Sequence, residues 1–267
     1  MSYELITMQI TKGVAVLTLD DPESLNAVST PMLRGMSAAL DVVEDPANGV
    51  RCVLMIGAGR AFSAGANLTG SDPSEVTDDE GRIDPGLLLD SVFHPVLLRL
   101  RDLHCPLITA VNGVAAGAGM SFAMMGDLVL AARSATFLQA FRGLGLVPDC
   151  GSSFLLPRIV GWGRALELSL LGRKISAEEA LEWGLVNFVF DQDQLEVEAM
   201  KLASDLASGP TVALGLIRKA YWESPGNTFE EQLRLERELQ RAAGRTKDFI
   251  EGISAFHRKL PARFRGE

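Results

Sequence analysis

The sequence predicts an α/β protein with a helical C-terminal region, and three observations carry this prediction. Cys52–Ile56 and Pro106–Val111 are apolar runs closely followed by glycine, which is typical of strands covered on both faces in a parallel sheet. A helix-like segment, Leu87–Leu103, lies between them. Beyond residue 205, apolar residues recur only at helical spacing. The 267 residues therefore divide into a mixed body, residues 1–205, and a helical tail, residues 206–267.

The N-terminal segments predict a hairpin followed by a helix. Tyr3–Ile10 and Val14–Leu19 are expected to be strands, because short apolar runs flank the Thr11–Gly13 link. Pro31–Val43 has apolar residues three or four positions apart and is expected to be an amphipathic helix. Met120–Met125, an apolar stretch after a glycine-rich turn, is predicted to be a further helix.

The C-terminal third carries several helix start signals. Ser176 and Glu179 form a capping-box pattern, in which the serine hydroxyl and the glutamate satisfy free N–H groups at a helix start. A short strand is predicted over Val186–Phe190. Further helices are predicted over Leu195–Ala207, over Val212–Trp222, after the capping box that begins at Thr228, and after Thr246.

Composition excludes several function classes. The net charge of −9 argues against a nucleic-acid partner, and no run approaches the roughly 20 apolar residues of a membrane span. The three cysteines have no metal-ligand spacing and there are only three histidines, so no metal site is expected. The N-terminus lacks the pattern of a secretion signal. A reducing, cytoplasmic location is therefore expected.

Charge is unevenly distributed. Residues 69–90 carry seven acids and one base among prolines and glycines, which predicts a mobile acidic loop. Residues 232–267 carry nine bases and five acids. Both segments are either solvated surface, or a loop over a pocket and a basic patch near an anionic ligand.

Two glycine-rich turns follow the predicted strands, at residues 57–67 and 113–119. Small residues there allow a ligand to approach the backbone, and N–H groups at the start of a helix lack partners. Turns from adjacent strands can direct two N–H groups at one oxygen, which is an oxyanion hole. Tight packing between helix and sheet explains the same composition.

A single acid, Asp149, lies in the apolar stretch Phe141–Gly151. A carboxylate in apolar surroundings is costly and normally has a partner or a chemical role. The alternative from the residues alone is that Asp149 caps a helix or turn.

Four stretches, in this order and spacing, resemble the enoyl-CoA hydratase/isomerase family, the crotonase superfamily, over nearly the whole chain. They are Ser24–Ala27, Gly59–Leu68, Ala110–Gly119 and Gly145–Asp149. Within the family, residues 140–158 and 235–256 look most like ring-1,2-epoxyphenylacetyl-CoA isomerases.

The resemblance implies a crotonase-like spiral of ββα turns with C-terminal helices that build homotrimers, often stacked as hexamers. It implies acyl-CoA thioester substrates, with coenzyme A as part of the substrate and no separate cofactor. The backbone N–H groups of Ala66 and Ala118 would form the oxyanion hole, with Gly117 in the same turn. The backbone near Ala64, Ala66 and Leu68 would hold the adenine of CoA.

Departures from the family pattern decide the expected chemistry. The two glutamates that hydratases use match Ser121 and Phe141, which we expect only to line the substrate site, because neither can activate water. Asp149 matches the aspartate that some family isomerases use as a single proton shuttle. Asn67 replaces the family's aspartate, and the basic residue before Ser24–Ala27 is absent, so individual CoA contacts differ.

The sequence therefore predicts an acyl-CoA isomerase in which Asp149 moves a proton. An apolar shell that includes Phe141 is expected to raise the pKa of Asp149 and make it a better base. Three alternatives stay open: a hydratase-like enzyme, a dehalogenase or hydrolase with Asp149 as nucleophile, and a non-catalytic acyl-CoA binding protein.

Two basic residues near the C-terminus, Arg258 and Lys259, have two interpretations. They either interact with the dipole at the end of the last helix, or reach a CoA phosphate on their own or a neighbouring subunit. The family has a basic residue near this end of the chain in the second role.

Overall fold

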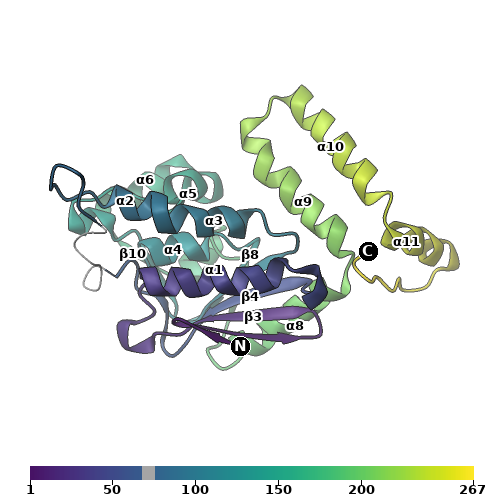
Figure 1. Ribbon diagram of the computed structural model, residues 1–267, viewed down its shortest axis with the longest axis horizontal. Coiled ribbons are helices and arrows are strands. Elements are labelled where there is room, and N and C mark those ends of the chain that lie inside the picture. Colours follow the sequence, from purple (N-terminus) through teal and green to yellow (C-terminus); the bar gives the residue numbers. More distant parts are fainter. Residues whose placement is uncertain (68–75) are drawn as a thin grey trace.

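The computed structural model describes residues 1–67 and 76–267 and contains two β-sheets built from successive turns of the chain (Figure 1). Within this part the larger sheet has seven strands in the order β1-β2-β3-β4-β6-β8-β11, and the smaller has four in the order β10-β9-β7-β5. The large-sheet strands are β1 (Ser2–Tyr3), β2 (Ile6–Thr11), β3 (Val14–Leu19), β4 (Cys52–Gly57), β6 (Leu107–Val111), β8 (Leu128–Ala132) and β11 (Phe188–Phe190). The small-sheet strands are β5 (Ala61–Ser63), β7 (Val114–Ala116), β9 (Thr136–Leu138) and β10 (Lys174–Ser176).

Each turn of the chain contributes one strand to each sheet. β4 leads to β5, β6 to β7 and β8 to β9, and pairing within each sheet is parallel for these strands. A helix follows each small-sheet strand of the last two turns. This is the spiral of ββα turns that the sequence resemblance implied, and that prediction is confirmed.

Helices cover the sheets and extend the C-terminal region. The helices of the body are α1 (Thr30–Glu44), α2 (Gly86–Leu88), the π-helical turn η4 (Leu89–Phe93), α3 (His94–Arg101), α4 (Ala118–Ala123), α5 (Ser152–Val160), α6 (Trp162–Leu171), α7 (Ala177–Glu182) and α8 (Leu195–Ser208). The projecting helices are α9 (Thr211–Glu223), α10 (Phe229–Ala243) and α11 (Lys247–Arg258), with short 3-10 turns at Pro22–Ser24, Pro46–Asn48, Phe141–Leu144 and Ser224–Gly226. None of the described helices is long and apolar enough to cross a bilayer.

The core lies between the large sheet and the helices on its two faces. Every residue of β6 is buried, as a strand covered on both faces requires. α1 turns Met32, Met36 and Leu40 toward the sheet, and all three are fully buried. Helix α8 packs against β4 and β6. The apolar periods that predicted these elements therefore correspond to their buried faces.

Several predicted boundaries hold, and others differ. The strand β3, the helices α1, α8 and α9, and the strands β4, β6 and β11 lie where expected. The predicted strand Tyr3–Ile10 is instead divided by a turn at Leu5 into β1 and β2, which pair antiparallel. The predicted helix Leu87–Leu103 is interrupted by η4 and ends at Arg101. The division near residue 205 falls inside α8, and the chain leaves the body at Gly209–Pro210. That division into two regions stays a prediction.

Each of the three predicted capping residues lies at the start of a helix. Thr228 and Glu231 satisfy each other's backbone N–H groups in a complete capping box. Ser176 and Thr246 each accept one N–H bond at a helix start. Glu179, expected to complete the box with Ser176, instead bonds its carboxylate to Arg173.

A buried ion pair fastens the projecting helices to the body. Arg218 of α9 is 6% exposed and bonds to the Asp127 carboxylate, which also accepts the Leu107 N–H at 2.7 Å. The guanidinium further donates to the carbonyl oxygens of Leu103 (2.6 Å) and Leu100 (3.1 Å). Burial raises the pKa of Asp127, while the positive charge of Arg218 opposes that rise. Either charge would be unfavourable in this buried position without the other.

Removing the cation should be costly. In Arg218→Met, Asp127 stays buried without its partner, and we expect a loss of about 3–5 kcal/mol in the free energy of unfolding. Lys219→Met, on the exposed side of the same helix, is the matched control and should change stability by less than about 0.5 kcal/mol. Urea unfolding followed by circular dichroism measures both. Equal losses of unfolding free energy in the two variants would show that the Arg218–Asp127 ion pair does not hold the projecting helices to the body.

Candidate active site

The two glycine-rich turns lie against each other at the ends of β5 and β7. Gly65 has a φ of +107°, and a Cβ built on it would lie 2.9 Å from the Ala116 carbonyl oxygen and 3.9 Å from the Ala118 nitrogen. Gly117 has a φ of +50° and a ψ of −124°. A side chain at either position would meet backbone or strain. Glycine is therefore what allows the two turns to meet.

Two backbone N–H groups are left free by this arrangement. Val28 N–H donates to the Gly65 carbonyl (2.7 Å) and the Val28 carbonyl accepts from Asn67 N–H (2.8 Å), so the N–H of Ala66 points away from this bridge. Ala118 begins α4, where an N–H has no acceptor within the helix. Neither N–H has an acceptor within residues 1–67 and 76–267. That they bind one thioester oxygen stays a prediction.

Two buried asparagines hold the first turn in place. Asn26 donates its amide to the carbonyl oxygens of Ala58 (2.9 Å) and Ala61 (2.8 Å). Asn112 donates to those of Gly57 (2.8 Å) and Gly59 (3.0 Å). Both belong to motifs that carry the family resemblance, but no physical role for either side chain was predicted from the sequence. The signal available was a polar amide inside an otherwise apolar stretch.

Asp149 lies on a tight, left-handed turn after the 3-10 helix of Phe141–Leu144. Its carbonyl accepts the Ser152 N–H at 2.9 Å, and the intervening residues Cys150 and Gly151 have φ of +51° and +79°. Two consecutive positive φ values define a type I′ turn. Of the alternative that Asp149 caps a helix or turn, the turn part fits, because Asp149 is the first residue of this turn, whereas Gly151 occupies the cap position of α5.

The Asp149 carboxylate is in a costly environment. Its Oδ1 atom is buried and has no hydrogen-bond partner. Burial raises the pKa of Asp149, while a hydrogen bond from the Cys150 thiol and the nearby His94 act in the opposite direction. A buried carboxylate oxygen without a partner is a candidate proton acceptor.

The two positions that replace the glutamates both lie beside this site. Phe141 is 6% exposed, and its ring approaches the Gly117 turn. Ser121 is fully buried, and its single hydroxyl proton is within reach of two carbonyl oxygens, that of Asp149 at 3.1 Å and that of Gly117 at 3.3 Å. Neither carries an acid, and Asp149 is the acidic residue that the described part of the chain bonds to α4. Direct substrate contact by Ser121 and Phe141 stays a prediction.

An apolar cavity opens beside the Asp149 turn. It has a volume of about 430 Å³ and is lined by Leu97 and Leu98 of α3, Met125, Cys150, Phe154 of α5 and Trp222 of α9, with His94 and Arg101 also on its wall. We call it the α3–α5 cavity. Because Cys150 and Gly151 line it, the cavity begins one residue from Asp149. The sequence did not predict it, since its walls come from three separate helices, α3, α5 and α9, and from two connecting segments.

The remaining predicted residues are less well placed. Ala64 donates its N–H to Leu25 at 2.9 Å and is half-buried, whereas Leu68 and the first part of the acidic segment 69–90 lie outside the described residues. Asp78, in the described part of that segment, accepts two N–H bonds from Arg82, at 2.8 and 2.9 Å. Within residues 1–67 and 76–267, no three His, Cys, Asp or Glu side chains cluster as metal ligands would.

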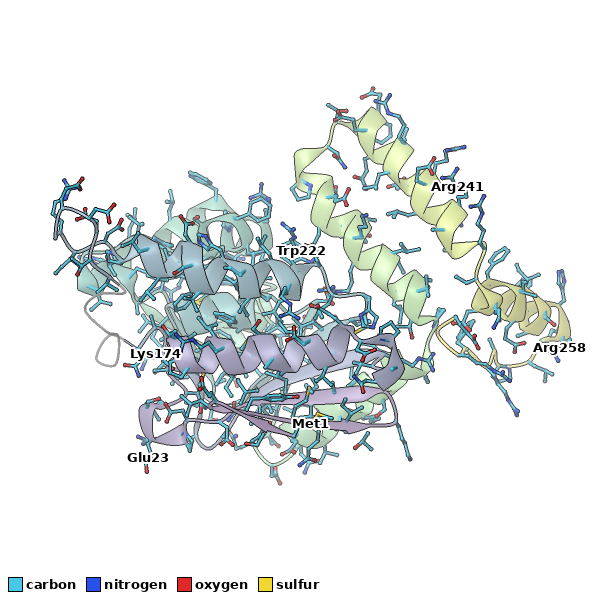
Figure 2. The ribbon with its side chains drawn as sticks, in the orientation of Figure 1. Met1, Glu23, Lys174, Trp222, Arg241 and Arg258 are labelled. Carbon is cyan, nitrogen blue, oxygen red and sulfur yellow. The ribbon has the colours of Figure 1, made fainter. Side chains whose placement is uncertain are left out.

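Arg258 and Lys259 lie far from the glycine turns. Figure 2 shows Arg258 at the outer end of α11, on the opposite side of the molecule from Lys174 of the small sheet. Arg258 bonds to the Ser254 carbonyl (3.2 Å) and lies 3.7 Å from Glu251, and Lys259 adopts the left-handed conformation that ends the helix. In a single chain both residues end α11. Contact with CoA on a neighbouring subunit stays a prediction.

Comparison with known proteins decides the family. The model of the enoyl-CoA hydratase/isomerase family matches residues 9–267. The chain belongs to the enoyl-CoA hydratase/isomerase family. The resemblance inferred from the four sequence stretches is thereby confirmed.

Relatives of this family member differ in their chemistry. The chain is 45% identical to the 1,2-epoxyphenylacetyl-CoA isomerase of Escherichia coli K12, over 99% of each chain. It is 39% identical to a probable enoyl-CoA hydratase of Rhodobacter capsulatus, over the full length of both. It is 32% identical to a 4-chlorobenzoyl coenzyme A dehalogenase of Arthrobacter, over 95% of this chain and 91% of that one. A solved enoyl-CoA hydratase structure from Geobacillus kaustophilus superposes with a TM-score of 0.89 at 32% identity, over 99% of each chain.

Replacing Asp149 should stabilise the enzyme at neutral pH. Because burial raises the pKa of Asp149, the folded chain binds this proton more tightly than the unfolded chain, and the ionised carboxylate costs folding free energy above the raised pKa. Asp149→Asn removes this cost. Its gain in Tm should be largest at neutral pH and shrink as the pH falls toward about 4, the ordinary aspartate pKa.

Asp102→Asn provides the control of opposite sign. Hydrogen bonds from Arg101 lower the pKa of Asp102, so folding favours its ionised form and the substitution should not raise the Tm at neutral pH. Differential scanning fluorimetry between pH 5 and pH 8 measures both variants. A Tm for Asp149→Asn that falls relative to the parent as the pH rises would contradict the account.

Proposed function

We propose that this protein is an acyl-CoA isomerase that moves a carbon–carbon double bond by a proton shuttle through Asp149. The observation that supports this most is the buried Oδ1 of Asp149, which has no partner and lies on a turn bonded to α4. The similarity to an isomerase at 45% identity favours the same class. Coenzyme A enters as part of the substrate, and no separate cofactor is required.

In the proposed mechanism the thioester carbonyl oxygen accepts the N–H groups of Ala66 and Ala118. Asp149 removes a proton from the α-carbon, and the electrons of the broken C–H bond move onto the carbonyl oxygen as an enolate. The two N–H groups stabilise that charge, and loss of one such donor typically costs about 3 kcal/mol of the barrier. Asp149 then returns the proton to the γ-carbon, which shifts the double bond. The raised pKa of Asp149 makes it a better base for a weak carbon acid.

The arrangement along α4 orients the acyl group. Ala118 begins the helix, Ser121 is bonded to Asp149, and Met125 of the α3–α5 cavity follows the helix end. With a rise of 1.5 Å per residue, Ser121 lies roughly 5 Å along the helix axis from Ala118, and Met125 lies two residues beyond the end of α4. An acyl group running parallel to α4 would place its α- and γ-carbons at Asp149 and its far end in the cavity. A volume of about 430 Å³ suits such a ligand.

Two observations support an oligomer. The face of α10 and α11 exposes Phe229, Phe249, Ile250, Ile253 and Phe256, and α6 exposes Trp162, Leu170 and Leu171. These surfaces lie at opposite ends of the molecule in Figure 1, as two different surfaces that join neighbouring copies in a closed ring would. We propose a homotrimer, or a hexamer of two trimers, as the family resemblance implies. Three buried free cysteines fit a reducing, cytoplasmic location.

A second candidate function uses Asp149 as a nucleophile. The similarity to a 4-chlorobenzoyl coenzyme A dehalogenase favours it. Attack by the carboxylate on a halogen-bearing aryl carbon would expel the halide and leave a covalent aryl ester, which water then hydrolyses. Mass spectrometry of the enzyme after mixing with substrate separates the two functions, since an isomerase accumulates no ester. A protein that binds acyl-CoA without turnover is the third possibility.

Asp149→Asn keeps the shape of the side chain and removes its basicity. We expect at least a roughly hundredfold loss of kcat with 3-hexenoyl-CoA, from the usual size of acid–base effects, and little change in thioester affinity. Ultraviolet absorbance of the conjugated 2-enoyl product measures turnover. Unchanged turnover would exclude Asp149 as the base.

Hydration should be weak or absent, because neither Ser121 nor Phe141 can activate water. The test is loss of crotonyl-CoA absorbance together with formation of the 3-hydroxy product. Turnover typical of enzymes, ~10 s⁻¹ or more, would show that hydration here needs neither glutamate.

The mass in solution should be a multiple of three 28.7 kDa chains. Phe249→Asp combined with Phe256→Asp places charges on the exposed apolar face of α11 and should shift the protein toward monomers. Sedimentation velocity at micromolar concentration measures both. A parent protein that sediments as a monomer would contradict the proposal.

A further inference from the structure

We propose that Ser121 is a positioning residue whose hydroxyl sets the place of Asp149 relative to the two glycine turns. The inference rests on the proposed function of Asp149 and adds a residue that does not itself touch the reacting atoms. It arises from one contact: the Ser121 hydroxyl donates to the backbone carbonyl of the residue that carries the base.

The carboxylate has little else to hold it. Its Oδ1 atom is buried without a hydrogen-bond partner among the described residues, and the groups that lower its pKa are the Cys150 thiol, His94 and its own backbone N–H. The direction of the carboxylate is therefore fixed through its own backbone. The Asp149 carbonyl accepts two bonds, from Ser152 N–H at 2.9 Å and from the Ser121 hydroxyl at 3.1 Å.

The Ser152 bond belongs to a turn that is strained. Cys150 adopts a φ of +51°, a left-handed conformation that is unfavourable for a residue with a Cβ. Strain of this kind persists only where the surroundings enforce it. Ser121 supplies such an external constraint, because it reaches the turn from α4, 28 residues away in the sequence.

Hydrogen bonds of Ser121 and its neighbours connect the Asp149 turn with the Gly117 turn that precedes Ala118. Ser121 also lies 3.3 Å from the Gly117 carbonyl, in the turn that precedes Ala118. On the other side, Ser152 accepts a bond from the buried Gln139 at 2.8 Å. One hydroxyl thus joins the segment that carries Ala118 to the segment that carries Asp149. The spacing between oxyanion donor and base then depends on Ser121.

The chain offers a matched control. Thr109 is also fully buried and donates its hydroxyl to a carbonyl of the same helix, that of Ala123, at 2.7 Å. That bond lies at the far end of α4 from Gly117. Thr109→Val therefore removes a buried hydroxyl bond to α4 without touching the Asp149 turn.

The first experiment compares kinetics with 3-hexenoyl-CoA. Ser121→Ala should lower kcat roughly 10- to 100-fold, the size expected when a catalytic group shifts by about 1 Å, with KM and the affinity for hexanoyl-CoA changed less than about twofold. Thr109→Val should keep kcat within about threefold at a comparable loss of Tm. Ser121→Cys fills nearly the same space with a weaker donor, and its kcat should lie between those of the parent and Ser121→Ala. Equal losses of kcat in Ser121→Ala and Thr109→Val would overturn the proposal.

The second experiment does not depend on activity. Amide hydrogen exchange of residues 149–152 should quicken in Ser121→Ala and stay unchanged in Thr109→Val, since only the first loses its bond to the turn. Unchanged exchange in Ser121→Ala would overturn the positioning role even if Asp149→Asn is inactive. Full activity of Asp149→Asn would instead refute the proposed function, and the exchange result would still decide whether Ser121 holds the turn.

Discussion

The close approach of the two glycine turns is the constraint on which the rest of the site depends. Gly65 lies so near Ala116 and Ala118 that a single methyl group would collide with backbone. This contact brings together the ends of β5 and β7, and the parallel pairing of those strands continues it into the body of the small sheet. Within the described residues, the N–H groups of Ala66 and Ala118 at these turns have no acceptor. The helix α4 starts there, so the place of everything bonded to α4 is set as well.

In the proposed mechanism, the base Asp149 and the two N–H donors are parts of one assembly. Asp149 is the costly member: its Oδ1 atom is buried without a partner and its turn contains a left-handed cysteine. A protein that was optimised for stability alone would have an amide or an apolar side chain there. The hydroxyl of Ser121 ties this unfavourable turn to a rigid helix at the position where hydratases of the family carry a glutamate. Ser121 cannot act as an acid or base, but its hydroxyl bonds to the backbone carbonyl of Asp149.

The sequence predicted the long, periodic and capped elements well, because their signals are local. Helix α1, the strands β4 and β6, and the capping box at Thr228 all carry their pattern within a few residues. It did not predict the three-residue strands of the small sheet, which are too short to show a period and form only by pairing with distant segments. Nor did it predict α5, α6 or the α3–α5 cavity. At the site it identified Asp149 and the two turns, whereas the contacts of Asn26 and Ser121 depend on carbonyl groups that no pattern reveals.

The central claim, that one carboxylate carries the proton from one carbon to another, can be measured by isotope transfer. A 3-enoyl-CoA that carries deuterium at the α-carbon is isomerised in ordinary water, and the product is analysed by mass spectrometry and NMR after a single turnover. Because the Oδ1 atom of Asp149 is buried, exchange with solvent competes poorly with return of the proton. The account predicts that a substantial part of the deuterium appears at the γ-carbon. Complete loss of the label to water would contradict it.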